Sequence, residues 1–403
     1  MIAVLLAQTI AITGGTVFPV AGPRLERATV LLRDGRIAAV GTNVAIPPGA
    51  SRIDATGKWV TPGLIDGASE MGLTEIGAVR ETNDAAVRND TVAASFNVAE
   101  GINPASTLIP ITRIAGVTTT LAVPAEGLIR GQAVLIDLDG ATLEAMLVKS
   151  PVAMVAELSA RTKDAGGGGS RAGAAERLRR VLDDALEYRR RKGDWARAQM
   201  HPLVAPAADL AALGPVLSGD LPLIVVANRR SDIETALRLA REYHLKLILA
   251  GAAEGWEIAG VIAGARVPVL VQPLDNVPSY DALGVRYENA ALLARAGVKV
   301  ALLETDTHNA RNLRQQAGNA VSNGMTWDQA LRAVTLSPAE IFGVAERYGS
   351  LEPGKVANVV VWSGDPFELG TVVEHVYIRG REIPLRSRQT ELLERYRKLP
   401  PKF

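Results

Sequence analysis

Residues 221–254, LPLIVVANRRSDIETALRLAREYHLKLILAGAAE, show a pattern that recurs along this 403-residue chain. Leu223–Ala227 is a short, continuous apolar run rich in β-branched residues, which is typical of a strand buried on both faces. An amphipathic helical pattern follows it, and Leu245–Ala250 then repeats the strand pattern. This order predicts two parallel strands that are joined by a crossover helix.

Similar apolar runs alternate with helical segments from about residue 61 to residue 344. The other runs are Thr118–Val123, Ala133–Ile136, Val152–Ala156, Val267–Val271 and Val298–Leu303. About eight such strands over roughly 280 residues favour a closed (β/α)8 barrel over an open doubly wound sheet. The sequence has no GxGxxG motif and no P-loop, which weakens a nucleotide-binding alternative. We therefore predict an α/β fold with a TIM-like barrel at residues 61–345.

The two ends of the chain have a different pattern. Short β-branched runs separated by glycine and proline turns fill residues 9–60, and they return at Val356–Trp362 and Val372–Ile378. We predict that residues 1–60 and 346–385 together form a small β-sandwich beside the barrel. Residues 386–403 are predicted to form a C-terminal docking helix or tail.

Composition excludes several classes of partner and site. Lysine plus arginine (44) nearly balances aspartate plus glutamate (43), so no overall field favours nucleic acid or an anionic membrane. Cysteine is absent, which excludes disulfides, thiolate nucleophiles and cysteine-ligated zinc. Any metal or acid–base centre would draw on four histidines: His201, His244, His308 and His375.

The first residues of the chain bear on the cellular compartment of the protein. The apolar run at residues 2–7, which Gln8 follows, is far shorter than the roughly 20 residues that span a bilayer. It matches the end of a secretory signal without the basic region, or else the approach to the first strand. Between a periplasmic and a cytoplasmic location, we favour the periplasm.

A glycine run, Gly166–Gly169, precedes a charged helical segment at Ala174–Arg191. Free backbone N–H groups at the start of a helix can bind an anion. A surface loop is the favoured interpretation of this run.

Three segments resemble a known family. They are DATGKWVTPGLID at Asp54–Asp66, LRAVTLSPA at Leu331–Ala339 and GSLEPGKVANVVVWSGD at Gly349–Asp365. Together they resemble the amidohydrolase superfamily, in its imidazolonepropionase-like branch, over nearly the whole chain. The resemblance implies the barrel and sandwich predicted above, and hydrolysis of C–N bonds other than ordinary peptide bonds. It also implies one or two divalent metals at the C-terminal mouth of the barrel, where they activate a water.

The first metal motif implied by the resemblance is absent. The family has two histidines, spaced His-x-His, shortly after the segment that ends at Asp66, whereas this chain reads Gly67–Glu70. Ala68 has no donor atom, and Glu70 could supply an oxygen. Glu70 is therefore a weak metal candidate.

The other ligand positions are also altered. Val226 or Asn228 stands where a histidine is expected after the fifth strand, and Gly251–Glu254 contains none after the sixth. No lysine fits the metal-bridging position of the fourth strand. Glu157 is a possible substitute there, although a carboxylate at a strand end more often makes hydrogen bonds.

One ligand position persists. Asp306 matches the family aspartate that contacts metal and carries the proton of the attacking water, and it is the second weak metal candidate. We predict Asp306, His308 and Glu304 as catalytic residues, with a loop histidine that caps the next helix as the alternative for His308. The predicted substrate-binding residues are Arg113, Asn228, Arg229 and Asn276.

The missing metal-ligand positions determine the predicted function. A bound metal lowers the pKa of water from 15.7 to about 7, which a carboxylate base alone cannot do. The favoured hypothesis is a non-catalytic or weakly active partner subunit without a metal cofactor, which assembles with a paralogous active amidohydrolase or with itself. One alternative is an active, zinc-dependent amidohydrolase on a small amide, cyclic amide or peptide-like substrate, with a site around Asp306. Another is a small-molecule-binding barrel.

Overall fold

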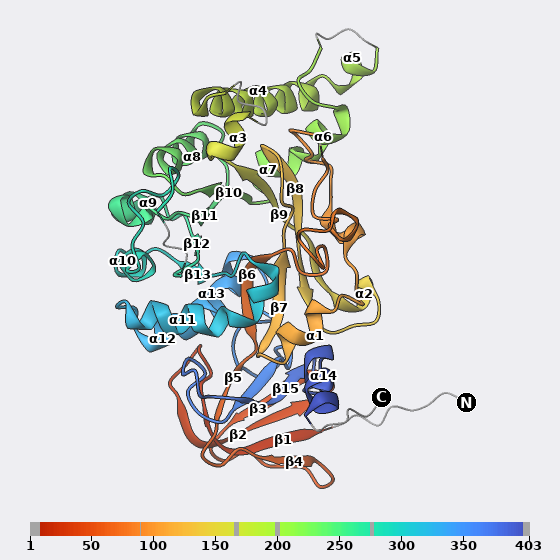
Figure 1. Cartoon of the computed structure of the whole chain (residues 1–403), viewed down its shortest axis with the longest axis vertical. Coiled ribbons are helices and arrows are strands. Elements are labelled where there is room, and N and C mark those ends of the chain that lie inside the picture. Colours follow the sequence, from red (N-terminus) through yellow and green to blue (C-terminus); the bar gives the residue numbers. More distant parts are fainter. Residues whose placement is uncertain (1–8, 89, 165–168, 198–201, 275–277, 398–403) are drawn as a thin grey trace, which may run out of the picture.

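The computed structural model describes residues 9–88, 90–164, 169–197, 202–274 and 278–397. Two eight-stranded sheets organise this part of the chain (Figure 1). One forms a nearly closed barrel surrounded by helices, and the other, built from both chain ends, lies beside it. The predicted fold class is confirmed.

The terminal sheet joins segments that are far apart in sequence. Its strands are β1 (Ile10–Val17), β2 (Leu25–Arg33), β3 (Arg36–Gly41), β4 (Ser51–Asp54), β5 (Trp59–Pro62), β14 (Val359–Trp362), β15 (Val373–Ile378) and β16 (Arg381–Glu382). Strands β5 and β14 pair antiparallel, which connects the two ends of the chain. Ile12, Val30, Val359 and Tyr377 lie in the core of this sheet, and each is almost fully buried.

The barrel follows directly after β5. Its strands are β6 (Leu64–Ser69), β7 (Val117–Ala122), β8 (Ile129–Asp137), β9 (Leu147–Glu157), β10 (Leu223–Ala227), β11 (Leu247–Gly251), β12 (Val269–Val271) and β13 (Val300–Leu302). Strands β9 to β13 are parallel, as predicted from the repeat. Beyond the last strand, the Glu304 backbone N–H donates to Asp66 Oδ1 at 3.0 Å and so links β13 to β6.

The direction of β8 differs from the prediction. This strand is antiparallel to both β7 and β9. Residues 123–128 connect β7 to β8, and a parallel crossover needs about a dozen residues or more. The short connection therefore forces the chain to turn back, and Ala122 at the end of β7 lies opposite Val134 of β8.

Helices cover the outside of the barrel (Figure 1). The α-helices are α1 (Leu108–Arg113), α2 (Leu143–Met146), α3 (Ala160–Asp164), α4 (Arg171–Arg190), α5 (Lys192–Ala196), α6 (Ala207–Ala212), α7 (Gly214–Leu217), α8 (Arg230–Glu242), α9 (Ala259–Gly264), α10 (Asn289–Arg295), α11 (Leu313–Ser322), α12 (Trp327–Ala333), α13 (Leu336–Ile341) and α14 (Arg388–Tyr396). Short 3-10 helices are η1 (Arg80–Thr82), η2 (Val98–Gly101), η3 (Gly255–Ile258) and η4 (Thr307–Asn312). Helix α14 has a capping box at Ser387, and none of its residues is buried.

Alternation along the strands separates the inside of the barrel from the outside. Ile224 packs in the inner cluster, whereas its neighbours Leu223 and Val225 pack in the outer cluster beneath the helices. Successive side chains of a strand point to opposite faces. The inner cluster also contains Ile65 and Leu270, so the barrel interior is a packed core.

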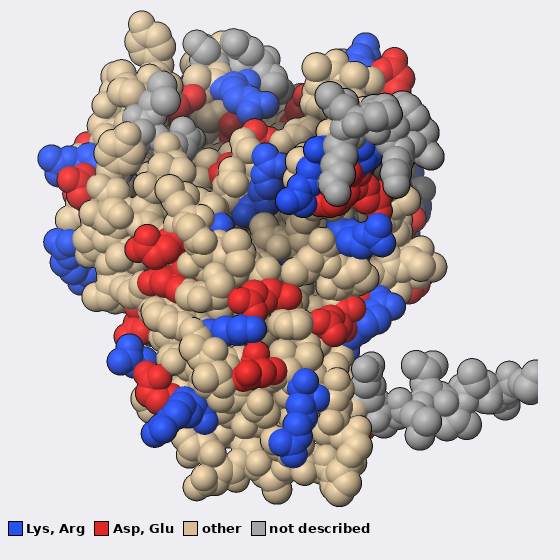
Figure 2. Space-filling model, turned by 60° about the horizontal axis from the view of Figure 1, so that its bottom comes forward, with Lys and Arg blue, Asp and Glu red and all other residues tan. Residues whose placement is uncertain are grey.

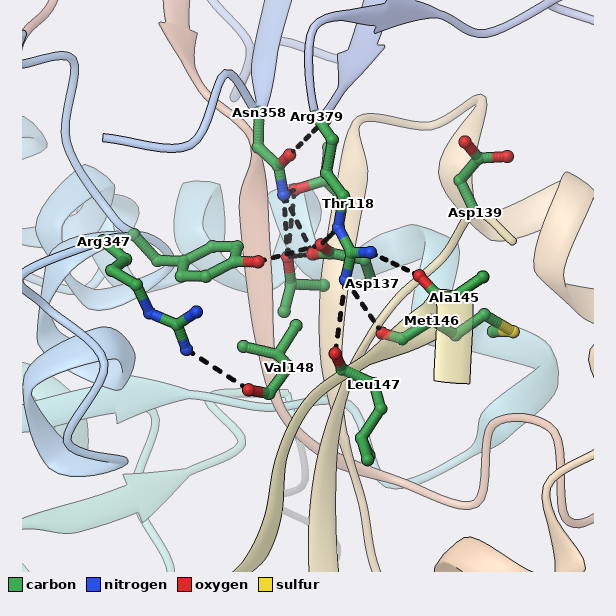
Figure 3. A network of polar contacts seen from close by, with 12 residues as sticks. Thr118, Asp137, Asp139, Ala145, Met146, Leu147, Val148, Arg347, Asn358 and Arg379 are labelled. Atoms are coloured by element: carbon green, nitrogen blue, oxygen red, sulfur yellow. Dashed lines mark hydrogen bonds and ion pairs between the residues drawn. The ribbon is translucent and has the colours of Figure 1, made fainter. Parts of the chain in front are cut away.

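A buried polar network joins the barrel to the terminal sheet (Figure 3). Asp137, at the end of β8, is fully buried and forms an ion pair with Arg379, whose Nε lies 2.6 Å from Oδ2. Thr119 Oγ1, Asn358 Nδ2 and Tyr348 OH donate to the same carboxylate at 2.8, 3.0 and 3.0 Å. A buried charge is tolerated when it is paired and hydrogen-bonded, as Asp137 is.

Charges are interspersed over the surface. Figure 2 shows Lys and Arg side chains next to Asp and Glu side chains on one face, with no large area of a single sign. This agrees with the formal net charge of +1. No helix within the described residues is both long and apolar enough to cross a membrane.

Candidate functional site

The carboxyl ends of the parallel strands meet at one end of the barrel, which we call the mouth. The first residues of the antiparallel strand β8 lie there too, because β8 runs the other way. In TIM-like barrels, binding and catalytic side chains come from this end. The predicted site residues are therefore expected to lie around this mouth.

Near the mouth, a layer of apolar side chains lines the barrel interior. Ala68, Val123, Val226, Ala250 and Leu303 all pack in or against the inner cluster. Ala68 and Val226 occupy two of the implied ligand positions. Neither has an oxygen, nitrogen or sulfur atom in its side chain that could bind zinc.

Glu70 is held by its own loop. Its carboxylate accepts a hydrogen bond from Thr74 Oγ1 at 2.7 Å, and its backbone N–H donates to Thr307 Oγ1 at 3.0 Å. These contacts give Glu70 a structural role between the loops that follow β6 and β13.

Asp306 is exposed and caps the helix η4. Its Oδ1 accepts from the His308 backbone N–H at 3.0 Å, and its Oδ2 accepts from Asn309 Nδ2 at 2.8 Å. The capping role considered for His308 therefore belongs to Asp306. The side chain of His308 is exposed, so these two predicted catalytic residues lie on the rim of the mouth.

Glu304 is buried between two amides. Gln272 Nε2 donates to its Oε1 at 2.9 Å, and Gln316 Nε2 donates to its Oε2 at 2.5 Å. Burial raises the pKa of Glu304 above its ordinary value. Neither glutamine was identified from the sequence, because nothing in the local pattern pairs residues from β12, β13 and α11.

Asp66, in the middle of β6, is a second buried carboxyl. Besides the bond from the Glu304 backbone, Thr120 Oγ1 donates to its Oδ2 at 3.3 Å. Burial raises the pKa of Asp66 to about 7, against the opposing effect of the backbone hydrogen bonds. Asp66 was quoted as part of the family motif but was not predicted as a site residue.

Glu157 points into the barrel. It is the last residue of β9 and lies next to Val226 in the register of β9 and β10. Its neighbours Ala156 and Leu158 both pack in the outer cluster, so alternation places the carboxylate inside. Glu157 thus faces the same interior as the fifth-strand ligand position.

A guanidinium accompanies this carboxylate. Arg130 of β8 lies between Ile129, which packs in the outer cluster, and Gly131, where a Cβ would lie 2.5 Å from the carbonyl oxygen of Phe96. Both flanking residues face outward, so Arg130 faces inward, where it forms an ion pair with Glu157. The two side chains are 10% and 6% exposed. A buried ion pair, with no net charge, therefore lies inside the mouth.

A serine completes this pair. Ser159 Oγ donates to the second oxygen of Glu157 at 2.6 Å. Arg130 Nε is buried and has no hydrogen-bond partner among the residues that the structure describes. Arg130 could not be predicted, because its pairing depends on the reversed direction of β8.

Two of the predicted substrate-binding residues flank the mouth. Asn228 Oδ1 accepts from the Ala253 backbone N–H at 3.4 Å and so supports the loop after β11. Arg229 is exposed at the start of α8. Asn276 lies outside the described residues, as does His201.

The expected position of Arg113 at the mouth is wrong. Its Nη1 donates to the Leu138 carbonyl at 3.3 Å and to Asp139 Oδ1 at 3.2 Å. Helix α1 precedes β7, so its last residue lies near the start of that strand. The end of the antiparallel strand β8 lies there as well, at the opposite end of the barrel from the mouth.

The described residues do not bring together a donor set for a divalent metal. Among the residues that the structure describes, no group of three or more His, Asp or Glu side chains could hold a metal ion. His375 contacts Glu382 in the terminal sheet, and His244 follows α8 at the far end of β11 from the mouth. The described imidazoles are therefore spread over the molecule instead of gathering at one point.

Comparison with known proteins gives the family. A family model described as "Amidohydrolase family" matches residues 228–383. The crystal structure of an amidohydrolase from Thermotoga maritima MSB8 superposes with a TM-score of 0.85 at 30% identity, over 94% of this chain and 100% of the other. The chain belongs to the amidohydrolase superfamily.

Sequence relatives place this amidohydrolase in the imidazolonepropionase-like branch. An imidazolonepropionase from Mesorhizobium japonicum is 26% identical over 84% of this chain and 87% of that protein. Amidohydrolase tasK of Hapsidospora irregularis is 24% identical over 87% of this chain. The chain spans 39% of the length of tasK.

Proposed function

We propose that this amidohydrolase is a non-catalytic or weakly active subunit that needs no metal. The observation that carries the proposal is the Arg130–Glu157 ion pair inside the mouth. Because the guanidinium already occupies the Glu157 carboxylate, a metal that used this carboxylate as a ligand would displace Arg130 and leave its charge buried and unpaired. The apolar residues at two ligand positions add no compensating donors.

The proposed partner is a paralogous active amidohydrolase or a second copy of this chain. A scaffold that retains its packed barrel and terminal sheet without a metal-binding donor set is suited to such a role. The periplasmic location also remains a proposal, supported by the apolar residues before Thr9 alone. Co-purification from the native source with either partner is the expected result.

A second candidate function is hydrolysis of a small amide, cyclic amide or peptide-like substrate. It is supported by Asp66, whose pKa of about 7 suits proton transfer near neutral pH, and by the exposed carboxylate of Asp306. Zinc would be the cofactor in that case, and its chemistry would be activation of a water.

An assay of turnover separates the two functions. Small amides, cyclic amides and dipeptides are incubated with the wild type, with Asp306→Asn and with Asp328→Asn, each with and without added Zn²⁺. Asp328 is an exposed aspartate of α12 and controls for the loss of one charge. We expect no turnover that zinc stimulates. Turnover that is lost in Asp306→Asn but retained in Asp328→Asn would replace the proposed function with the second candidate.

A further inference from the structure

A cavity of about 340 Å³ lies outside the barrel wall, between the starts of two helices. Leu158, just after β9, lines it and packs in the outer cluster, so the cavity lies on the outer side of this strand. The first turns of α4 and α8 line it with Ala172 and Ser231. No residue of the proposed metal-free mouth other than Ser159 takes part in the lining.

Three arginines line this cavity, against one carboxylate. Arg171 is already engaged, since its guanidinium forms ion pairs with Asp232, which also lines the cavity, and with Asp281. Arg179 contacts Glu242 through Nε, at 3.0 Å from Oε2. The remaining N–H groups of Arg179 are not used in that ion pair.

Arg238 is the least neutralised of the three. Its Nη2 donates to Thr235 Oγ1 at 2.8 Å, a neutral acceptor. Within the described part of the chain, no carboxylate forms an ion pair with Arg238. Its side chain is exposed at the opening of the cavity, so a ligand from solvent can reach it.

The first turns of α4, a 20-residue helix, and of α8, with 13 residues, both reach this cavity. The helix dipole makes this end of each helix positive. Several backbone N–H groups there are already used, since Gly173 donates to Ser170 Oγ at 3.0 Å and Arg230 donates to Glu254 Oε2 at 2.8 Å. The guanidinium groups of Arg238 and Arg179 are therefore the main donors of the lining.

We propose that this cavity binds a small oxyanion group, such as a phosphate or sulfate group, through the guanidinium groups of Arg238 and Arg179, beside the positive ends of α4 and α8. Charge-assisted hydrogen bonds from guanidinium groups and helix N-termini are the usual means of holding such a group. The proposed oxyanion site on α4 and α8 does not depend on the function proposed for the barrel mouth. The glycines before Gly169 lie outside the described residues, and the site does not depend on them.

Isothermal titration of the full chain with inorganic phosphate tests the site. Sulfate and acetate are titrated in parallel at matched ionic strength, to distinguish a tetrahedral oxyanion from a carboxylate. The wild type is expected to bind phosphate or sulfate saturably, with one site per chain. Arg238→Gln and Arg179→Gln are each expected to weaken binding by roughly tenfold, the effect of losing about 1.4 kcal/mol.

Arg241→Gln is the matched control. Arg241 is an exposed arginine of the same helix that does not line this cavity, and its replacement changes the net charge equally. Binding in this variant should equal that of the wild type. The proposal is overturned if the wild type binds no oxyanion saturably, if acetate binds as well as phosphate, or if all three variants behave alike.

Discussion

Replacing Arg379 with methionine is expected to lower the free energy of unfolding by about 3 kcal/mol. The substitution leaves the carboxylate of Asp137, which is 0% exposed, without its cationic partner. Breaking a buried ion pair costs about 3–5 kcal/mol, and the lower end applies because Arg379 itself is 36% exposed. The measurement is the urea midpoint and slope of equilibrium unfolding.

Arg381→Met is the control for this prediction. Arg381 lies two residues away and pairs with Asp139, but its side chain is 66% exposed. The median exposed ion pair contributes about 1 kcal/mol or less. If the two variants are destabilised equally, the network in Figure 3 does not stabilise the junction between barrel and terminal sheet.

Replacing Arg130 with methionine is expected to cost about 3–5 kcal/mol, because Glu157 would be left buried and unpaired. The double variant Arg130→Met with Glu157→Leu removes both charges and should recover most of this loss, since apolar residues of similar volume often replace a buried pair without cost. Arg230→Met, which breaks a pair whose arginine is 52% exposed, is the control.

Chemical denaturation of these variants tests the placement of the ion pair inside the barrel. If Arg130→Met loses no more stability than Arg230→Met, the Glu157 carboxylate must be solvated once its partner is removed. If the double variant is no more stable than Arg130→Met, the loss of stability comes from changed packing and not from an unpaired carboxylate.

The barrel could be predicted because its signal is local and repeated. Leu223–Ala227 and Leu245–Ala250 flank a helical pattern, and the order of these elements is enough to specify parallel strands. The direction of β8 depends instead on the length of one connection, residues 123–128, whose limits were not fixed by the apolar runs. That reversal also brings Arg130 to the mouth, and it explains why this residue was missed.

The candidate site was predicted less well, for a related reason. Asp306 and Glu157 were proposed because motif and strand pattern place them at strand ends. Their hydrogen bonds depend on side-chain partners that are distant in sequence, such as Gln316 on Glu304. Arg113 was assigned to the wrong end of the barrel, because its residue type alone suggested a role in binding substrate.

The amount of zinc that the wild-type chain holds tests the central claim most directly. The protein is purified without chelators, dialysed against buffer with a small excess of Zn²⁺, separated from free metal and analysed by elemental mass spectrometry. The ion pair in the mouth and the apolar ligand positions predict far less than one zinc per chain. One zinc per chain, retained through gel filtration and lost on replacement of Asp306 or Glu157, would contradict the account.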